Sequence, residues 1–529
     1  MRAADNTIDA PGALVLGAGI AGLFTALKLA PYPALVIASG QSGQSGSSVW
    51  AQGGIAAAVG SNDSWSLHAQ DTLLAGAGIG DAGIAELVAR EAPQRVDDLV
   101  RLGVPFDHDL SGRLALAREA AHSLARIVHV SGDRAGAAIM KTISTAAAAT
   151  PSITIAGGFE AVELAILDGR AIGLFARYRS GRDASLVLFR APAIVFATGG
   201  IGALYAVTTN PLESRGQGMG MAARAGAVIA DAEFVQFHPT AINIGSDPAP
   251  LATEALRGDG AVLIDENGRR FMTTVHPAGD LAPRDIVARS IHREIARGHR
   301  AFLDCRTAIG GAFASRFPTV YATCKRARID PAKEPIPVAP AAHYHMGGIA
   351  TDARGRSSIA GLWSVGECAS TGLHGANRLA SNSLAEAIVF GVRVAEDVKG
   401  TTDVRVRKGK VPAAPPLVAS VLPQELRRTM SSLVGVERDE PGLSKALGVV
   451  RKLERAAGGD PTSLNMLAAA KLIAAAALQR RESIGAHFRR DHPQRSVDCW
   501  RSHIVLQEAE KIAARCEDSA GQAPARKLP

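Results

Sequence analysis

A glycine-rich turn between an aliphatic strand and an apolar helix constrains this chain more than any other feature. Residues 13–17 (Ala-Leu-Val-Leu-Gly) predict a short buried strand, and the turn over residues 17–22 (Gly-Ala-Gly-Ile-Ala-Gly) follows it. Residues 23–30 have the spacing of an apolar helix, and residues 34–38 form a second aliphatic run. This order predicts a βαβ unit built on a dinucleotide-binding turn.

Each glycine of the turn has its own geometric role. Gly17 permits the tight turn, Gly19 lets backbone amides approach a pyrophosphate, and Gly22 lets the helix pack closely on the strand. The N-terminus of the helix then faces the anion. NAD-binding units of this kind carry an acidic residue about 20 residues further on, which holds the ribose. Ser39 stands there instead, which disfavours NAD and leaves a hydroxyl for the ribose.

Composition excludes several classes of protein. The chain has 529 residues, 47% of them hydrophobic, so we expect a large buried core and no extensive disorder. Aromatic residues make up only 4%, and no basic stripe is interleaved with them, so the net charge of +8 predicts no nucleic-acid partner. The five cysteines are scattered and form no CxxC pair, so we expect no metal site, no iron–sulfur cluster and no disulfide framework. We expect no leader and no membrane span, and therefore a cytoplasmic protein.

The chain divides into segments of different amino-acid composition and periodicity. Residues 191–198 predict another buried strand, which ends at Thr198-Gly199-Gly200 in the manner of strands that pass under a flavin dinucleotide. Proline, histidine and arginine become frequent from about residue 233 to 345, and glycine-rich sequence returns at residue 347. Three prolines within residues 408–416 predict a linker, and helical periodicity follows it over 422–453 and 463–480.

These segments predict a fold of three parts. We expect an α/β, Rossmann-like dinucleotide-binding domain over residues 1–235 and 347–404, interrupted by an inserted α+β domain over residues 236–346. A C-terminal helical bundle should span residues 417–520.

A loop without charge lies soon after the first βαβ unit. Residues 45–55 (Ser-Gly-Ser-Ser-Val-Trp-Ala-Gln-Gly-Gly-Ile) contain paired glycines beside a polar amide. Such a loop can place backbone donors against an isoalloxazine ring. Taken without its context, the same sequence is more typical of an ordinary flexible loop.

Histidines and arginines recur in the inserted segment and at its borders, in contexts that we interpret as loops. Each one alone is more typical of a structural residue or a surface charge. Together they supply a forked guanidinium for each carboxylate of a small dicarboxylate, with histidine donors beside it. The residues that carry this hypothesis are His238, Arg257, Arg284, His343, His345, His374 and Arg378.

Several long motifs resemble, in the right order, those of the succinate dehydrogenase/fumarate reductase flavoprotein superfamily. They cover most of the chain and consist of residues 51–55 (AQGGI), 237–240 (FHPT), 253–258 (TEALRG), 281–285 (LAPRD), 373–384 (LHGANRLASNSL) and 481–493 (RESIGAHFRRDHP).

Two features distinguish the branches of this superfamily. In the dehydrogenases a histidine four residues before the Ala-Gln-Gly-Gly alanine carries FAD covalently, and Ser47 occupies that position here. Residues 118–123 (Arg-Glu-Ala-Ala-His-Ser) resemble the Arg-Glu-Gly-Gly-His-Ser segment of the L-aspartate oxidase family. Residues 342–348 (AHYHMGG) also resemble a segment of that family. The resemblance therefore implies an FAD-dependent L-amino-acid oxidase with non-covalent FAD.

The resemblance also implies a set of substrate contacts. Aspartate is succinate with an α-ammonium group, so its site needs one additional anion, for which Glu119 is the candidate. His238, Thr253, His343 and Arg378 would hold the two carboxylates. Arg284 would lie beside the substrate Cα and Cβ, where hydride leaves for the flavin. We thus expect Arg284, Glu119 and His238 to be catalytic.

The cofactor contacts follow from the glycine turn and from the same resemblance. Ser383 and Leu384, at the start of a helix, would offer backbone amides to the flavin, and Glu367 would accept a ribitol or ribose hydroxyl. Gln217 departs from the aspartate that is usual in the family, keeping its hydrogen bonding without the charge. The full expected set is Gly17, Ala18, Gly19, Gly22, Ser39, Ser47, Ser48, Ala51, Gln52, Gly53, Gly54, Thr198, Gly199, Gln217, Glu367, Ser383 and Leu384.

The implied reaction is the oxidation of L-aspartate to iminoaspartate, with FAD reoxidised by O2, giving H2O2, or by fumarate. It would be the first step of de novo NAD biosynthesis via quinolinate, with a functional link to quinolinate synthase. The alternative enzyme is a soluble fumarate reductase or succinate dehydrogenase-type flavoprotein, disfavoured by Arg118 and Glu119. A non-catalytic flavoprotein subunit of a membrane complex is disfavoured by Ser47.

Overall fold

The structure is a computed structural model that describes residues 6–40, 46–178, 186–401, 414–416 and 423–521. The predicted linker over residues 408–416 therefore lies outside the described residues except for 414–416. The ends of two predicted domains, residues 402–404 and 417–422, also lie outside them.

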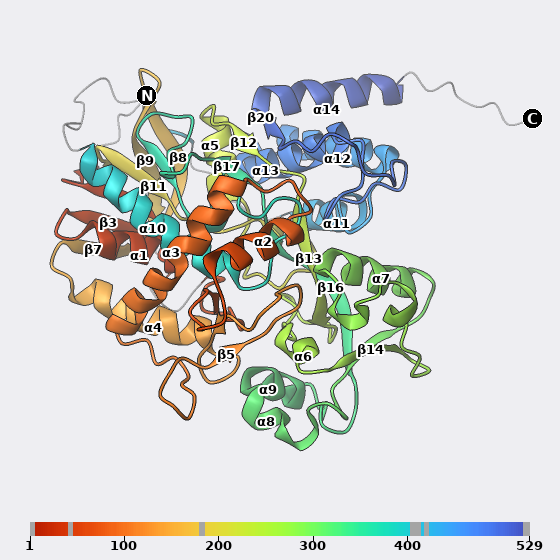
Figure 1. Cartoon of the computed structure of the whole chain (residues 1–529). Helices are drawn as coiled ribbons and strands as arrows, with labels where there is room; N and C mark the ends of the chain where they lie inside the picture. Colours follow the sequence, from red (N-terminus) through yellow and green to blue (C-terminus); the bar gives the residue numbers. More distant parts are fainter. Residues whose placement is uncertain (1–5, 41–45, 179–185, 402–413, 417–422, 522–529) are drawn as a thin grey trace, which may run out of the picture.

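A five-stranded parallel sheet forms the centre of the first part (Figure 1). Its order is β18-β11-β2-β3-β7, with bounds Leu362–Ser364, Ala193–Phe196, Ala13–Leu16, Ala34–Ala38 and Ile153–Gly157. The predicted βαβ unit is present as β2, helix α1 (Ile20–Leu29) and β3. Because the strands run parallel, their carboxyl ends meet at one edge, where the loops that follow them can share a ligand.

Side chains alternate between the two faces of this sheet, as the two-residue period of a strand requires. Ala13 and Val15 of β2 belong to a core shared with the helices on one face, whereas Leu14 and Leu16 belong to a core on the other. The helices on the first face are α1, α3 (Ala82–Arg101), α4 (Ala135–Ala149) and α10 (Asn382–Gly400).

A four-stranded sheet covers part of the second face (Figure 1). Its order is β1-β10-β9-β8, with bounds Thr7–Asp9, Leu186–Arg190, Arg170–Tyr178 and Phe159–Leu167. Two smaller sheets complete this part. The first has the order β4-β6-β5, with bounds Ile55–Ala56, Ile127–Val128 and Leu116–Ala117. The second has the order β19-β17-β12-β20, with bounds Ala369–Ser370, Gly348–Ala350, Ile229–Ala230 and His503–Ile504. Helices α2 (Trp65–Ala75) and α5 (Gln217–Arg224) also belong to it.

A separate antiparallel sheet with its own core forms the inserted part, drawn in green in Figure 1. Its order is β13-β16-β15-β14, with bounds Val235–Ile242, Ile336–His345, Ala301–Asp304 and Val262–Asp265. Its helices are α6 (Ala255–Gly258), α7 (Arg284–Ala296), α8 (Phe313–Arg316) and α9 (Pro318–Arg326). We call this part the cap. Its antiparallel pairing and separate core have the character expected of an α+β insertion.

Four helices form the C-terminal part, drawn in blue in Figure 1. Their bounds are α11 Gln424–Leu433, α12 Glu440–Ala456, α13 Pro461–Gln479 and α14 Leu506–Gly521. Helix α13 is long and apolar enough to cross a membrane, but 83% of its apolar window is buried. It therefore serves as the core helix of this part, between α5, α12 and α14.

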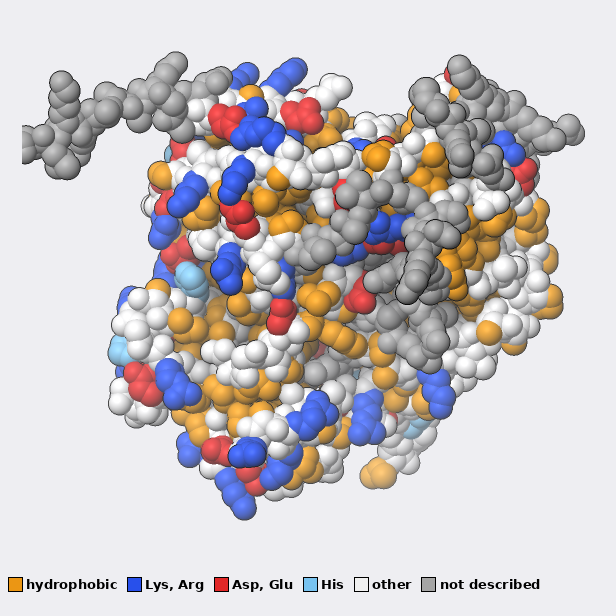
Figure 2. Space-filling view, turned by 180° about the vertical axis from the view of Figure 1, so that it is seen from behind, with side chains coloured by type: hydrophobic (Ala, Val, Ile, Leu, Met, Phe, Trp, Pro, Cys, Tyr) orange, Lys and Arg blue, Asp and Glu red, His pale blue; other side chains and the backbone are white. Residues whose placement is uncertain are grey.

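Basic side chains are dispersed over the face turned away from Figure 1. Figure 2 shows Lys and Arg there mixed with acidic, polar and apolar side chains. On this face the positive net charge is spread out, as expected for a solvated surface.

Candidate active site

One cavity of about 690 Å³ extends from the carboxyl ends of the parallel strands to the cap. Its volume is in the range of sites that enclose large organic ligands. Of the expected cofactor, substrate and catalytic residues, Gly22 alone does not line it, and of the residues in the dicarboxylate hypothesis Arg257, His345 and His374 do not. Those that do are Gly17, Ala18, Gly19, Ser39, Ser47, Ser48, Ala51, Gln52, Gly53, Gly54, Glu119, Thr198, Gly199, Gln217, His238, Thr253, Arg284, His343, Glu367, Arg378, Ser383 and Leu384.

Close backbone packing explains the glycines of the first turn. Gly17 has φ +115°, and a Cβ there would lie 2.2 Å from the Ala197 carbonyl oxygen. A Cβ at Gly22 would lie 2.0 Å from the Gly17 carbonyl oxygen, so Gly22 shapes the turn without lining the cavity. Gly19, the N-cap residue of α1, has no side chain that could cap the helix. Ser48 Oγ instead accepts a hydrogen bond from Ile20 N at 3.1 Å. The remaining N-terminal amides fit an anion such as a pyrophosphate.

Two polar atoms point to a ligand in the middle of the cavity. Among the described residues, Thr198 Oγ1 and Gln52 Oε1 are buried without a hydrogen-bond partner. The other amide atom of Gln52 is engaged, since Nε2 donates to the Leu251 carbonyl of the cap at 2.9 Å. Buried polar atoms are normally paired, so both atoms fit contacts to a bound cofactor.

The loop that contains Gln52 is packed closely against its neighbours. A Cβ at Gly54 would lie 2.0 Å from the Val128 carbonyl oxygen, and one at Gly53 would lie 3.0 Å from Ser381 Oγ. The paired glycines therefore let the loop approach both β6 and the start of α10. This close approach brings the loop beside Ser383 and Leu384, where a flavin ring is expected.

Helix α10 begins at the cavity wall without a side-chain cap of its own. Ser381, its N-cap residue, has φ +60°, and Ser383 and Leu384 lie in the first turn. The free amides of that turn suit the edge of a flavin on which negative charge develops. Glu367 lies nearby and accepts a hydrogen bond from His345 N at 3.1 Å. Burial raises the pKa of Glu367 to about 7, so a hydroxyl contact would suit it better than a second anion.

The side-chain amide of Gln217 forms its hydrogen bonds with residues of the C-terminal part. Its Nε2 donates to the Thr462 carbonyl at 2.8 Å, and its Oε1 accepts from Asn465 Nδ2 at 3.1 Å. It still lines the cavity. The departure from aspartate at this position is therefore matched by contacts to α13.

Two histidines occupy the cap side of the cavity on strands, which corrects the expectation that they lie in loops. His238 lies on β13 and His343 on the adjacent β16, with ring centroids 4.9 Å apart. His238 Nδ1 accepts from Thr240 N at 3.2 Å, so Nε2 is left to carry its proton. Burial and nearby arginines hold the pKa of both histidines well below 6.5. Both are therefore neutral hydrogen-bonding groups.

A buried carboxylate orients Arg284 toward the cavity. Arg284 Nε donates to Glu254 Oε2 at 2.5 Å, and Nη1 donates to Gln236 Oε1 at 3.0 Å. Glu254 also accepts from Arg257 Nη2 at 2.8 Å. The two arginines hold the pKa of Glu254 below its usual value in spite of burial, which alone would raise it. Glu254 is thus an ionised anchor for Arg284.

Arg378 provides a second guanidinium at the same end. It lies 4.4 Å from the centroid of the Tyr344 ring, and its Nη1 donates to Ser383 Oγ at 3.2 Å. Its Nε has no partner among the described residues. Burial and the neighbouring Arg284 lower the pKa of Arg378 to about 10. An incoming carboxylate would meet both the charge and the unpaired N–H.

Glu119 adds an anion to this cationic end. Glu119 is 4% exposed and lies in a turn rather than on a helix. Its carboxyl group accepts a hydrogen bond from Ser381 Oγ at 2.7 Å. Burial, followed by repulsion from Glu254, raises the pKa of Glu119. The cavity therefore offers a buried carboxyl group that a positive ligand would ionise.

Several residues that shape this end were not predicted from the sequence to have a role there. They are Gln236, Glu254 and Ser381. Gln236 lies two residues before His238 on one strand, so the alternation of side chains could have placed both on the same face. Thr209, whose Oγ1 lies 2.8 Å from His343 Nδ1, follows no comparable pattern.

Comparisons with known proteins agree with this geometry. The family described as "FAD binding domain" matches residues 12–384, and "Fumarate reductase flavoprotein C-term" matches residues 463–520. A solved variant of Escherichia coli quinol fumarate reductase superposes with a TM-score of 0.86 at 28% identity, covering 94% of each chain. These matches confirm the predicted fold class and FAD as the cofactor.

Curated relatives show to which branch of the flavoprotein superfamily this chain belongs. An L-aspartate oxidase of Caulobacter vibrioides is 49% identical over 94% of this chain and 97% of its own length. One of Mesorhizobium japonicum is 47% identical over 93% of this chain and 94% of its own length. With these relatives and the match of the FAD-binding family over residues 12–384, the chain belongs to the L-aspartate oxidase family.

Proposed function

We propose that this chain oxidises L-aspartate to iminoaspartate with FAD bound without a covalent link. One observation carries the proposal beyond a generic diacid redox enzyme. The buried carboxyl group of Glu119 lines the same cavity as Arg284 and Arg378. A diacid alone would need only the cations, whereas an amino diacid also needs an anion for its nitrogen.

The diacid itself is held by groups from two parts of the fold. Arg378, from the segment before α10, supplies a forked guanidinium to one carboxylate. His238, His343 and Thr253 of the cap supply neutral donors to the other. Because these neutral donors come from the cap, its position over the parallel sheet sets the distance between the two carboxylate sites.

Glu119 acts on the substrate nitrogen. Amine oxidation requires the neutral amine when hydride leaves Cα, so the ammonium group must first lose a proton. A carboxyl group with a raised pKa is a suitable acceptor for that proton. Arg284, fixed by Glu254 and Gln236, stays charged and polarises the substrate beside Cα and Cβ.

FAD, when bound, would supply the two-electron acceptor of the reaction, with O2 or fumarate as the final oxidant. The chain contributes the backbone amides of Ser383 and Leu384 to the edge of the ring. Ser47, at the position of the covalent histidine of the dehydrogenases, has its Oγ 3.0 Å from Ser214 Oγ. A serine there supports non-covalent binding.

The wider setting belongs to the same proposal. The product would enter de novo NAD biosynthesis through quinolinate, with quinolinate synthase as the functional partner that consumes it. A cytoplasmic location is supported by the five cysteines, all of which are free. The separate core of the cap supports the domain boundaries expected from the sequence.

The proposal is tested with the FAD-loaded protein and a panel of substrates. We expect O2 uptake and H2O2 with L-aspartate, and none with succinate or L-glutamate. Glu119→Gln should reduce aspartate oxidation more than fumarate reduction. Glu213→Gln, which alters another acid of the cavity wall, is the matched control and should change neither. Equal losses of both activities in Glu119→Gln would contradict the role of Glu119, and succinate oxidation by the unaltered protein would favour the alternative enzyme.

A further inference from the structure

The turn that carries Glu119 is held in an unfavourable backbone conformation. His122 N donates to the Glu119 carbonyl at 3.3 Å, and Arg118 Nε donates to the His122 carbonyl at 2.9 Å. Within the turn, Ala121 has φ +65°, a left-handed conformation that favours glycine over residues with a Cβ. Contacts from outside the turn must therefore hold it in place.

The ring of His122 ties this turn to the start of α10. Its Nε2 lies 2.9 Å from the Ala380 carbonyl oxygen. The next residue, Ser381, donates from Oγ to Glu119 Oε2 at 2.7 Å. The backbone of the turn and the Glu119 carboxyl group are thus fixed to two adjacent residues. We call this closed set of contacts among Glu119, His122, Ala380 and Ser381 the Glu119 circuit.

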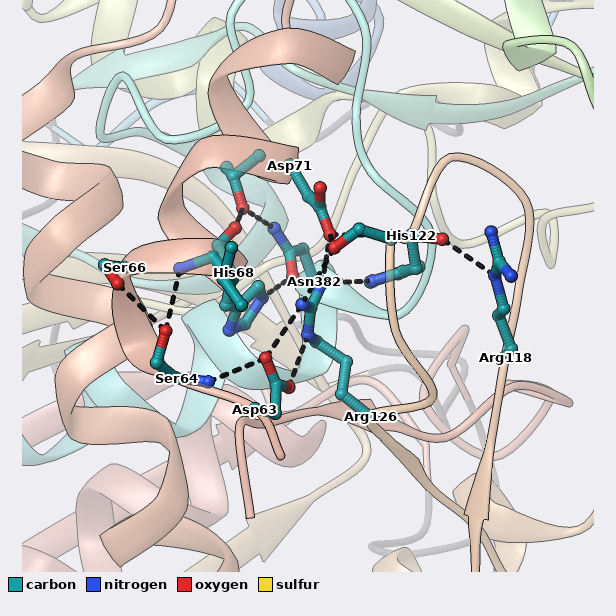
Figure 3. Close-up of polar contacts among 12 residues, drawn as sticks. Asp63, Ser64, Ser66, His68, Asp71, Arg118, His122, Arg126 and Asn382 are labelled. Carbon is teal, nitrogen blue, oxygen red and sulfur yellow. Dashed lines mark hydrogen bonds and ion pairs between the residues drawn. The ribbon is translucent and has the colours of Figure 1, made fainter. Parts of the chain in front are cut away.

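A buried ion network anchors the circuit on its other side (Figure 3). Arg126 is fully buried and pairs with Asp71 and with Asp63, the latter through Nε at 2.8 Å. Arg126 Nη1 lies 3.1 Å from His122 Nδ1. Because a guanidinium only donates, Nδ1 must be the acceptor, and Nε2 must carry the proton that is donated to Ala380. Arg126 therefore sets the tautomer that the circuit requires.

A second histidine beside this network provides a natural comparison. His68 is as buried as His122, and the two ring centroids are 6.4 Å apart. Its Nε2 lies 2.8 Å from Asn382 Oδ1, and Asn382 Nδ2 donates to Thr72 Oγ1 at 2.9 Å. His68 thus joins α2 to α10 (Figure 3), and among the described residues its ring makes its hydrogen bond to Asn382 and not to the turn of Glu119.

We propose that His122 is a positioning residue that holds Glu119 at the place of the substrate ammonium group. Through the Glu119 circuit it determines the preference for an amino diacid over a plain diacid. The inference rests on the proposed function, because it takes Glu119 as the partner of that ammonium group. His122 itself acts through Glu119 and lines no part of the cavity among the described residues.

The test compares three variants of the FAD-loaded protein, His122→Phe, His122→Gln and His68→Phe. The measured quantity is the ratio of kcat/KM for L-aspartate oxidation to kcat/KM for fumarate reduction. A misplacement of about 1 Å in a reacting site can cost about 100-fold, so we expect His122→Phe to lower the ratio by about 10- to 100-fold. His122→Gln should keep the ratio within a few fold, because its amide can accept from Arg126 and donate to Ala380. His68→Phe should keep the wild-type ratio.

Two further measurements separate positioning from general damage. Flavin content and the Kd of succinate, measured by the change in flavin absorbance, should be unaltered in His122→Phe. If that variant does not fold, Ser381→Ala breaks the same circuit from the other side and should lower the ratio. The inference is overturned if His122→Phe keeps the wild-type ratio or if His68→Phe lowers it equally. Absence of aspartate oxidation in the unaltered protein would instead refute the proposed function.

Discussion

The Asp133 carboxylate, which lies in the segment before α4, accepts hydrogen bonds from the Thr319 N–H of the cap. Both carboxylate oxygens lie 3.1 Å from Thr319 N, and one lies 3.1 Å from Val320 N. These amides belong to the first turn of α9, whose own N-cap residue, Phe317, makes no side-chain cap. A residue of the nucleotide-binding part therefore caps a helix of the cap, and both Asp133 and Thr319 line the cavity.

We expect Asp133→Ala to weaken the attachment of the cap. Loss of a helix N-cap costs about 1 kcal/mol, and here it also removes a contact between two parts of the fold. The free energy of unfolding should fall by about that amount, and KM for L-aspartate should rise while flavin content stays constant. Burial raises the pKa of Asp133, so the neutral Asp133→Asn should lose less than Asp133→Ala. Equal KM values in all three proteins would show that this contact does not hold the cap over the substrate.

Replacement of Arg284 by Leu should abolish turnover. Arg284 is 7% exposed and donates hydrogen bonds to Glu254 and Gln236 of the cap segment rather than to the glycine turn, so FAD should bind normally. Removal of a group that acts on the proton or charge of the transition state costs about 10²- to 10⁴-fold in kcat. Single-turnover reduction of FAD by L-aspartate measures this step directly. Near-normal reduction in Arg284→Leu would refute its role, and Arg293→Leu, at the exposed end of the same helix, is the control.

Gln217→Asp restores the residue that is usual in the family, but it should destabilise this chain. The carboxylate would lose the donor to the Thr462 carbonyl and place negative charge beside it. A buried acceptor left without its donor costs about 1–3 kcal/mol. Chemical denaturation should show a loss of that size, without tighter FAD binding in a flavin titration. Tighter binding at unchanged stability would mean that the aspartate contacts the flavin here as well.

Local signals predicted the strand, turn and helix at the end of the cavity where the nucleotide is expected. The turn from Gly17 to Gly22 is encoded within one βαβ unit, so strand, turn and helix are all visible in consecutive residues. The first turn of α10, with Ser383 and Leu384, is equally local. In such segments the pattern of the sequence and the structure depend on the same neighbours.

Long-range pairing explains what the sequence left open at the substrate end. His238 was interpreted as a loop residue, yet all eight residues of β13 are buried and the strand pairs with β16. The partners of Arg284 lie 30 and 48 residues away along the chain, at Glu254 and Gln236. No spacing within one element reveals such contacts, since the fold of the cap brings them together.

The two buried histidines of the ion network predict a loss of stability in mild acid. Burial lowers the pKa of both His68 and His122 to about 4, against about 6.5 in an unfolded chain, with Arg126, Asp63 and Asp71 as the charged groups around them. Between these values the unfolded chain binds more protons than the folded one, so stability is full above pH 6.5 and falls as the pH drops toward 4. Each histidine should account for about 3 kcal/mol of this loss.

His68→Gln keeps a donor for Asn382 but does not titrate. Its free energy of unfolding should therefore gain about 3 kcal/mol relative to wild type when denaturation curves at pH 7.5 and pH 4 are compared. Parallel pH profiles for the two proteins would show that His68 is protonated in the folded state at pH 5 and that the network tolerates its charge.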